Sequence, residues 1–150
     1  MNIRSAIASD ADDVYMWRND DLVRKMSFNS DRVDYSTHIK WFNEALNDDN
    51  RLLFIGELHE HKIGICRFDL DTNSTPLSAR VSIHMNPTFR GRGLAKSLLH
   101  KAIQWYRSQE EDIELIAEIK PENKASIQLF SSLGFVLHSR STALLEYHFY

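Results

Sequence analysis

The sequence predicts a single α/β domain built on a mixed β-sheet. A length of 150 residues corresponds to one domain. Short apolar strand segments and amphipathic helical segments follow one another in the order β-α-α-β-β-β-α-β-α-β-β. A hairpin within that order pairs its strands antiparallel, whereas a strand–helix–strand connection allows parallel pairing. We therefore expect residues 1–150 to form one domain around one sheet.

The N-terminal third is expected to contain a short strand and two helices. Residues 2–6 form the strand, and Ser9 then suits the N-cap of a helix because several aspartates follow it at the positive helix end. Residues 19–34 are polar and irregular. A second helix is predicted over 36–46, and it stops before an Asn-Asp-Asp-Asn run.

Two strands in the middle of the chain are expected to form an antiparallel hairpin. They cover residues 52–58 and 63–70 and are joined by a polar turn. In the second strand the alternation of apolar residues changes between Ile65 and Cys66. This change predicts either a bulge or burial of both strand faces.

The second half predicts two further strand–helix units and a closing hairpin. A strand over 79–85 ends before Pro87, and the next helix runs from Leu94 to about residue 107. The apolar side of that helix is expected to hold Leu94, Leu98, Ala102 and Trp105. A strand over 113–119 leads to a helix that opens at residues 121–123. Gly134 suits its C-terminal cap, and the closing strands follow at 135–138 and 144–149.

Composition and charge argue against several functions. The 18 basic and 21 acidic residues leave a net charge of −3, which disfavours a general nucleic-acid binder. The seven histidines are scattered without metal-site spacing. The single cysteine, Cys66, suits a reducing compartment, and we interpret it as a core residue. The first ten residues lack the apolar stretch expected of a signal peptide, and no run approaches the roughly 18 apolar residues of a membrane helix. We expect a cytoplasmic protein without a metal.

The turn around Gly91 and Gly93 is the strongest functional signal. Glycine has no Cβ, so a ligand can approach the backbone closely, and the free N–H groups of a starting helix favour an anion such as phosphate. Arg90, Arg92 and Lys96 add positive charge at the rim. The turn matches neither of two common phosphate motifs, G-x-x-x-x-G-K-[ST] and G-x-G-x-x-G. The alternative is an ordinary strand–helix turn with a solvated basic rim.

Two motifs resemble a known family. The segment Arg90-Gly91-Arg92-Gly93-Leu94-Ala95 resembles the R/Q-x-x-G-x-G/A signature of the GNAT N-acetyltransferases. The spacing Asn123-x-x-Ser126-x-x-x-Phe130-x-x-x-Gly134-Phe135 resembles that family's N-x-x-A-x-x-x-Y-x-x-x-G-F segment. The resemblance implies a GNAT fold in which the strands predicted at 79–85 and 113–119 splay apart. It also implies transfer of the acetyl group of acetyl-CoA directly to an amine.

The resemblance further implies which residues contact acetyl-CoA. Backbone groups of one strand end would pair with the pantetheine arm, the glycine turn would hold the pyrophosphate, and Asn123 would lie near the sulfur. The implied cofactor-binding residues are Ile83, His84, Met85, Gly91, Arg92, Gly93, Leu94, Ala95, Lys96, Asn123 and Phe130. The family often has tyrosine at position 130 to protonate the leaving sulfur, and phenylalanine cannot donate a proton.

Glu118 is the candidate base that takes a proton from the amine. Its position is similar to that of the base glutamate in ribosomal-protein alanine acetyltransferases. The alternative is a solvated carboxylate at a strand edge. His84 has a reference pKa of about 6.5, which also suits a base, but its segment is expected to contact the cofactor through its backbone.

The acceptor is expected to lie against the N-terminal helices and the closing strands. The segment Trp17-Arg18-Asn19-Asp20-x-x-Val23-Arg24 resembles the start of two GNAT groups, one acting on amino-sugar nucleotides in pseudaminic acid biosynthesis and one on N-termini of ribosomal proteins. Arg18 and Arg24 could hold a pyrophosphate beside an apolar wall of Met26, Phe28, Trp41 and Phe42. Alternatively, the aromatic residues are helix core and the arginines are solvated.

These observations leave three functions open. The first is acetylation of an amino-sugar nucleotide or another small amine. The second is acetylation of a protein N-terminus or lysine. The third is a CoA-binding module without turnover, which Phe130 motivates. The expected partners are acetyl-CoA and an amine acceptor, without nucleic acid or membrane, and a homodimer stays open.

Overall fold

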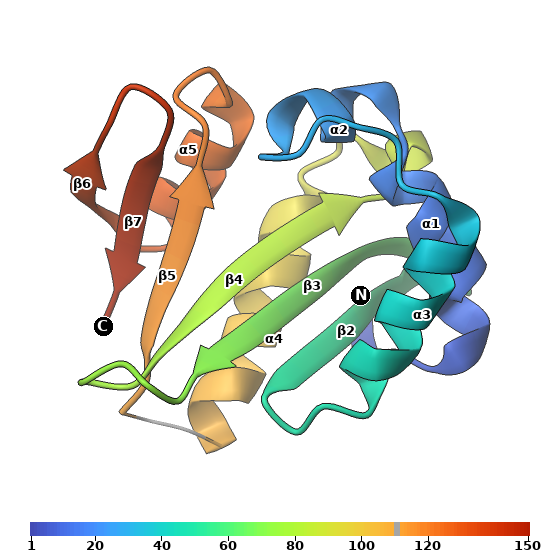
Figure 1. The fold of residues 1–150 in the computed structure, drawn as a ribbon, viewed down its shortest axis with the longest axis horizontal. Coiled ribbons are helices and arrows are strands. Elements are labelled where there is room, and N and C mark those ends of the chain that lie inside the picture. Colours follow the sequence, from blue (N-terminus) through green and yellow to red (C-terminus); the bar gives the residue numbers. More distant parts are fainter. Residues whose placement is uncertain (110–111) are drawn as a thin grey trace.

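A computed structural model describes residues 1–109 and 112–150, and it places seven strands in one sheet with the order β1-β2-β3-β4-β5-β7-β6 (Figure 1). The strands are β1 (Asn2–Ser5), β2 (Arg51–Leu58), β3 (His61–Asp71), β4 (Ser78–Met85), β5 (Glu114–Ile119), β6 (Val136–Arg140) and β7 (Leu145–Phe149). The helices are η1 (Ala8–Asp10), α1 (Ala11–Arg18), α2 (Asp21–Met26), α3 (Tyr35–Leu46), η2 (Pro87–Phe89), α4 (Leu94–Gln109) and α5 (Lys124–Ser132). The predicted α/β architecture with a mixed sheet is confirmed.

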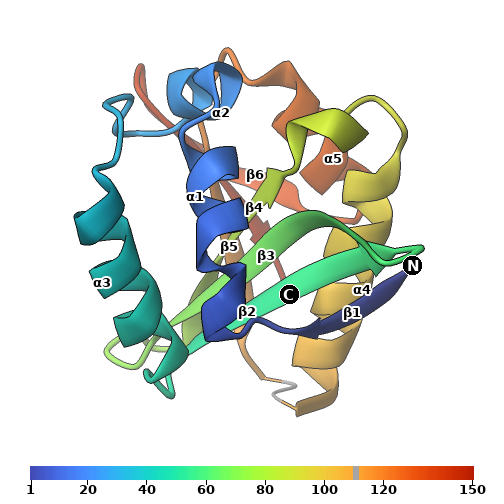
Figure 2. The same cartoon turned by 90° about the vertical axis from the view of Figure 1, so that its right-hand side faces the viewer.

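The sheet has one face covered by α4 and α5 and another covered in part by α1 and α3 (Figure 2). We call these the α4 face and the α3 face. The larger core lies on the α4 face and includes Leu98 and Leu99 of α4. The smaller core lies between α1, α3 and the first strands, and Trp17 and Phe42 belong to it. In Figure 1 no helix covers the α3 face of β5 and β7, whereas α1 contacts β4.

The central hairpin forms as predicted, with a different position for the irregularity. The residues from Ile63 to Cys66 are all buried, so both faces of β3 are covered at this point. The register shifts between the pairs Gly56–Gly64 and Glu57–Lys62, so the extra residue is Ile63 of β3. A Cβ on Gly56 would come within 2.9 Å of a Leu98 methyl group, so glycine allows α4 to pack closely here. Burial raises the pKa of the Cys66 thiol, which fits a core residue.

The start of α1 is held by a buried carboxylate. Asp10 is fully buried and accepts two hydrogen bonds from Arg4, both at 2.8 Å, and one from the backbone N–H of Ile7 at 2.8 Å. Lys62 Nζ lies 2.8 Å from the same carboxylate. Burial opposes ionisation, but these donors hold the pKa of Asp10 well below its usual range. The predicted N-cap at Ser9 is wrong, because α1 begins after Asp10.

The prediction of an irregular segment over 19–34 is wrong for residues 21–26, which form α2. The side chain of Asp20 caps this helix by accepting the backbone N–H groups of Leu22 at 3.1 Å and Val23 at 3.2 Å. Leu22, Val23 and Met26 have helical spacing, but six residues are too few for a periodic pattern to stand out, and none of them is buried.

The later helices follow the predicted pattern with one exception. Leu98 and Ala102 are buried on α4, whereas Trp105 is 40% exposed and Tyr106 takes its place in the core. At the end of α5, Gly134 has a φ of 100°, the left-handed conformation expected of a glycine cap. Across the described ranges, none of the helices has both the length and the apolar character needed to cross a membrane.

Candidate active site

The sheet is broken between β4 and β5. These parallel strands pair only at Ser78–Glu114, Ala79–Leu115 and Arg80–Ile116. Beyond that point β4 continues along β3 as far as Met85, while β5 follows β7 as far as Ile119. Figure 1 shows the two strands diverging from their shared lower ends. The predicted splay is confirmed, and it leaves the edge of β4 from Val81 onward without a strand partner on the β5 side, so its backbone groups can bind a ligand.

The glycine turn lies directly before α4. Gly91 and Gly93 both have a φ of 73°, a conformation that disfavours any residue with a Cβ. An added Cβ would meet no atom within 4 Å at either position, so the backbone faces open space. An open pocket of about 370 Å³ starts here, and it is lined by Gly93, Lys96, Ser97, His100 and Leu133. The free N–H groups at the start of α4 lie beside this pocket, where they favour an anion.

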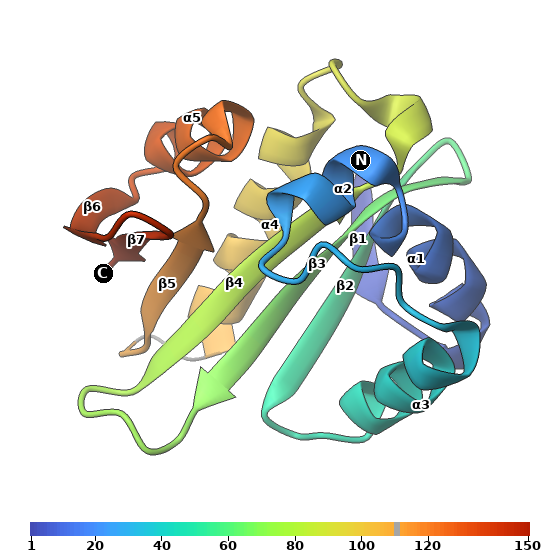
Figure 3. The same cartoon turned by 45° about the horizontal axis from the view of Figure 1, so that its top comes forward.

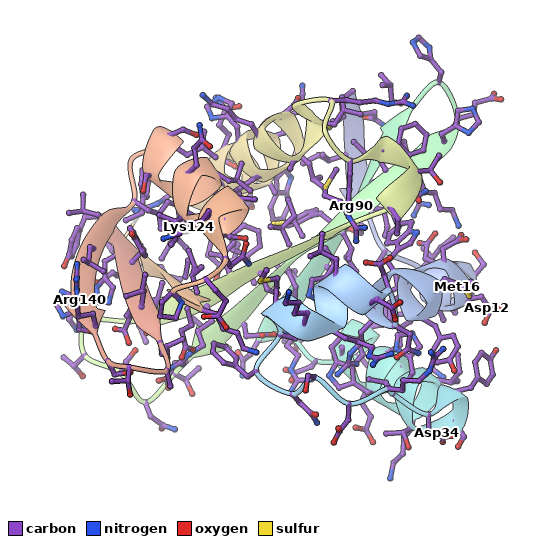
Figure 4. All side chains as sticks on the ribbon, turned by 90° about the horizontal axis from the view of Figure 1, so that it is seen from above. Asp12, Met16, Asp34, Arg90, Lys124 and Arg140 are labelled. Carbon is purple, nitrogen blue, oxygen red and sulfur yellow. The ribbon has the colours of Figure 1, made fainter. Side chains whose placement is uncertain are left out.

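The basic residues of the turn have different roles. Arg90, labelled in the view from above in Figure 4, forms an ion pair with Asp20, which ties the turn to the start of α2. The hydrogen bond from Arg90 holds the pKa of Asp20 below its usual value. The Arg92 guanidinium lies 5.3 Å from the ring centroid of Phe89. Lys96 is exposed at the pocket rim and thus remains available to an anionic ligand.

Glu118 lies on the α3 face of β5, because it alternates with core residues that face α4. Its carboxylate pairs with Arg80, which belongs to the last residue pair before the strands separate. The Glu118 side chain is 22% exposed, so solvent and a small substrate can both reach it. The predicted base is therefore an ion-paired carboxylate beside the break rather than a freely solvated one.

His84 lies on the same α3 face, further along β4. Burial lowers its pKa to about 4, and the positive charges of Arg67 and Arg18 act in the same direction. The imidazole is therefore neutral near pH 7. His84 thus presents its side chain on the face that carries Glu118, while its backbone lies along the break.

Two arginines meet over one tryptophan beside His84. The guanidinium carbons of Arg18 and Arg67 lie 4.9 Å and 5.2 Å from the Trp41 ring centroid. Arg24 does not join them, because it pairs with Asp21 at 3.5 Å and donates to the backbone carbonyl of Ser30. Of the two arginines considered from the sequence for one pyrophosphate, only Arg18 lies in this cluster. The sequence did not indicate that Arg67 belongs to this cluster. The one pattern that could have pointed to it is its place in β3, where it is a charged residue between buried core residues.

Helix α2 spans the open end of the break (Figure 3). On one side, Asp20 at its start pairs with Arg90 of the glycine turn. On the other side, Lys120 after β5 donates to the backbone carbonyl of Lys25 at 3.0 Å. The break is therefore bordered by the ends of two strands and by one short helix.

Two further predicted residues belong to α5. Asn123 caps this helix by accepting the N–H of Ser126 at 3.2 Å. Phe130 is 3% exposed and lies in the larger core, with its ring edge-on to Phe135 at a centroid distance of 5.0 Å. The structure therefore places the Phe130 side chain among core residues.

One group of side chains has the spacing of a metal site in the described part of the chain. Ligand atoms of His138, Glu146 and His148 lie within 4.8 Å of one another. The same His148 already contacts Glu146 at 2.6 Å and Glu114 through its other nitrogen. The rings of the two histidines are stacked at 3.9 Å, so they do not converge on one point. Hydrogen bonds and ring stacking among side chains of this chain thus explain why the three residues lie close together, without a metal ion.

A family model described as an acetyltransferase (GNAT) domain matches residues 1–136. The chain belongs to the GNAT acetyltransferase family. The two motifs that suggested this family from the sequence therefore identified it correctly, and the broken sheet and glycine turn lie where those motifs predict them.

Two curated relatives resemble part of this GNAT chain. One is an uncharacterized N-acetyltransferase of Methanocaldococcus jannaschii, 29% identical over 63% of the chain. The other is the L-amino acid N-acyltransferase MnaT of Escherichia coli, 28% identical over 73% of the chain. The chain covers 43% and 64% of their respective lengths, which is less than two thirds of each relative.

Solved structures with the same fold cover nearly the whole GNAT chain. A ribosomal-protein-alanine N-acetyltransferase from Brucella melitensis has a TM-score of 0.83, 23% identity and 99% coverage of both chains. The structure of yncA from Salmonella typhimurium with its cofactor acetyl-CoA has a TM-score of 0.82 and 23% identity, and it covers 99% of this chain and 92% of its own. At these identities the likeness establishes the fold.

Proposed function

We propose that this GNAT protein, acting as one domain over residues 1–150, transfers the acetyl group of acetyl-CoA directly to an amine. The observation that carries the proposal is the break between β4 and β5, which lies next to a glycine turn that opens α4. A strand edge with free backbone groups suits an extended amide-containing arm, and the turn suits a pyrophosphate. Membership of the GNAT family and the acetyl-CoA in the yncA structure support the same donor.

The residues at the break match the shape and charge of the donor. Backbone groups of Ile83, His84 and Met85 would hold the pantetheine arm along the free edge of β4. The pyrophosphate would take the N–H groups of Gly91, Arg92, Gly93, Leu94, Ala95 and Lys96. Asn123 and Phe130 would border the sulfur end.

Glu118 is the proposed base. It takes the proton from the attacking amine as the new C–N bond forms and the C–S bond of the thioester breaks. Arg80 remains cationic beside it and holds the carboxylate next to the start of the break. The departing thiolate takes a proton from water, because Phe130 has none to donate. Neutral His84 is the alternative base on the same sheet face.

The best candidate acceptor is an amino-sugar nucleotide or another small amine, and the alternative is a protein N-terminus or lysine. The segment from Trp17 to Arg24 resembles the start of both sugar-nucleotide and ribosomal-protein enzymes, so it supports both choices. The name of the E. coli relative, an L-amino acid N-acyltransferase, also supports a small acceptor. The name of the B. melitensis structure, a ribosomal-protein-alanine N-acetyltransferase, supports the alternative.

A CoA-binding module without turnover is the candidate from another functional class. It is favoured by Phe130, which cannot protonate the leaving thiolate. The test is release of free CoA thiol from acetyl-CoA in the presence of amino-sugar nucleotides, amino acids, polyamines and peptides in separate reactions. The proposal predicts thiol release with at least one small amine. Tight acetyl-CoA binding without release in any reaction would establish the module instead.

A further inference from the structure

The cluster of Arg18, Arg67 and Trp41 on the α3 face holds two like charges in a half-buried position. Burial lowers the pKa of Arg18, and the charge of Arg67 lowers it further. The Trp41 ring offsets part of this repulsion through cation–π contacts, and Arg18 also benefits from its place in the last turn of α1. Neither of these supplies hydrogen-bond acceptors for two guanidinium groups.

The carboxylates nearby do not balance the two cations. Asp69 Oδ2 lies 2.9 Å from Arg67 Nε, and the more distant Arg51, at 3.8 Å from Asp69, has a nearer partner in Asp48 at 3.3 Å. The excess positive charge is therefore that of Arg18. Within the described ranges Arg18 has no carboxylate at ion-pair distance. Moreover, Arg67 Nε is buried, and its close contact with Asp69 lacks the angles of a hydrogen bond. The cluster therefore has unused donors and excess positive charge.

The position of the cluster connects it to the proposed reaction. Arg67 pairs in register with Ser82, which lies between Arg80 and His84 on β4. Arg80, Ser82 and His84 are alternate residues of β4 on the α3 face. Glu118 lies on the same face on the other side of the break. About a third of the Arg67 side chain is exposed, at 30%, so a ligand can reach it. A small acceptor whose amine reaches Glu118 would thus extend over the arginines.

We propose that the acceptor amine belongs to a small molecule that carries an anionic group, a carboxylate or a phosphate, and that Arg18 and Arg67 bind this group. The inference rests on the proposed acetyl transfer and names its substrate class. Guanidinium groups bind both anions through paired hydrogen bonds, and such charge-assisted bonds are strong where water is partly excluded. Arg18 and Arg67 are specificity-determining residues in this account, and Glu118 remains the group at the reacting amine.

Paired acceptors that differ only in the anion test this inference. An L-amino acid is compared with its carboxamide, and a nucleotide-linked amino sugar with the free amino sugar, so the two arms separate carboxylate from phosphate. In each arm the anionic member should have the higher kcat/KM, by about tenfold or more, as hydrogen bonds to charged groups predict. In Arg18→Gln and Arg67→Gln this preference should fall to about twofold or less, mainly through KM.

Lys40→Gln is the matched control, because Lys40 is an exposed cation next to Trp41 in α3 and has no contact with its ring in the described structure. The Lys40→Gln variant should keep the preference for the anionic acceptor. That result would show that the anion binds at the arginines and that a general loss of positive charge is not the cause. Arg67→Lys, which keeps the charge without the planar fork, should restore part of the preference. Thermal unfolding of each variant identifies any that fail to fold, and the remaining arginine variant then decides.

A binding measurement separates this inference from the proposed function. Fluorescence of Trp41 is titrated with each acceptor in the presence of CoA, and Trp41→Phe identifies its contribution to the signal. Tighter binding of the anionic member without any acetyl transfer would support the anion site and overturn the proposed function. Acetyl transfer at equal kcat/KM to charged and neutral members of both pairs would overturn the anion site and leave the proposed function standing.

Discussion

Arg80 and Glu118 form an ion pair at the point where β4 and β5 separate. The pair lies on the sheet face opposite α4, whereas the pocket beside the glycine turn lies at the start of that helix. The candidate base and the candidate donor site are therefore separated by the broken sheet itself. A thioester that passes through the break would meet an amine on the α3 face.

Replacing Glu118 with glutamine tests the base. We expect Glu118→Gln to lower kcat by about 10²- to 10⁴-fold at saturating amine, because the amide cannot take a proton. Acetyl-CoA affinity should change little. Glu146→Gln is the matched control, because Glu146 is the cross-strand neighbour of Glu118 on β7. Equal losses in both variants, or a rate within about twofold of wild type for Glu118→Gln, would remove Glu118 from this role.

A substitution at Gly93 tests the donor site. Gly93→Val should weaken acetyl-CoA binding by about tenfold or more, because the added atoms occupy the space in front of the free N–H groups. A positive φ also strains any residue with a Cβ, so a control with the same strain is needed. Gly134→Ala is a control for backbone strain, at a φ of 100° and outside the pocket lining, and its Cβ additionally comes within 3.1 Å of the Phe149 ring. Calorimetric titration measures the acetyl-CoA affinity of both variants. An unchanged affinity in folded Gly93→Val would contradict a pyrophosphate site at this turn.

Phe130 tests whether the reaction needs an acid at that position. The wild-type protein should release CoA with a suitable amine, and in Phe130→Tyr kcat should change by less than the roughly 10²-fold expected of a catalytic acid. Because the side chain is 3% exposed, an unpaired hydroxyl would cost about 1–3 kcal/mol of stability. Thermal unfolding and steady-state rates measure the two effects. Turnover by the tyrosine variant alone would mean that the wild-type chain is a binding module.

The lowered pKa of His84 predicts a pH dependence of stability. The folded-state value is about 4 and the ordinary value is 6.5, so between these values the unfolded chain binds a proton that the folded chain does not. Stability should therefore fall as the pH decreases through this window. His38, whose pKa burial also lowers, contributes with the same sign. His84→Asn should flatten the dependence, as measured by urea unfolding at about pH 7 and about pH 5. If the free energy of unfolding of His84→Asn varied with pH as steeply as that of the wild type, the lowered pKa of His84 would be contradicted.

Local sequence patterns predicted most of the fold. The order of strands, the glycine turn and the cap at Gly134 all depend on neighbouring residues and were confirmed. Helix α2 was missed because its six residues are too few to establish an apolar period. Its position depends on the ion pair between Asp20 and Arg90, which lie far apart in the sequence. The pairing of Arg80 with Glu118 and the approach of Arg67 to Arg18 arise in the same way, from strand register and helix packing. No spacing rule predicts such contacts.

The most direct test of the proposed reaction is a parallel measurement of CoA thiol release and of acetylated amine by mass spectrometry. Wild-type protein is incubated with acetyl-CoA and one small amine at a time. The account predicts that, for at least one amine, both products form in equal amounts and that both are lost together in Glu118→Gln. Thiol release without acetylated amine, or acetyl-CoA binding with neither product for every amine, would contradict it.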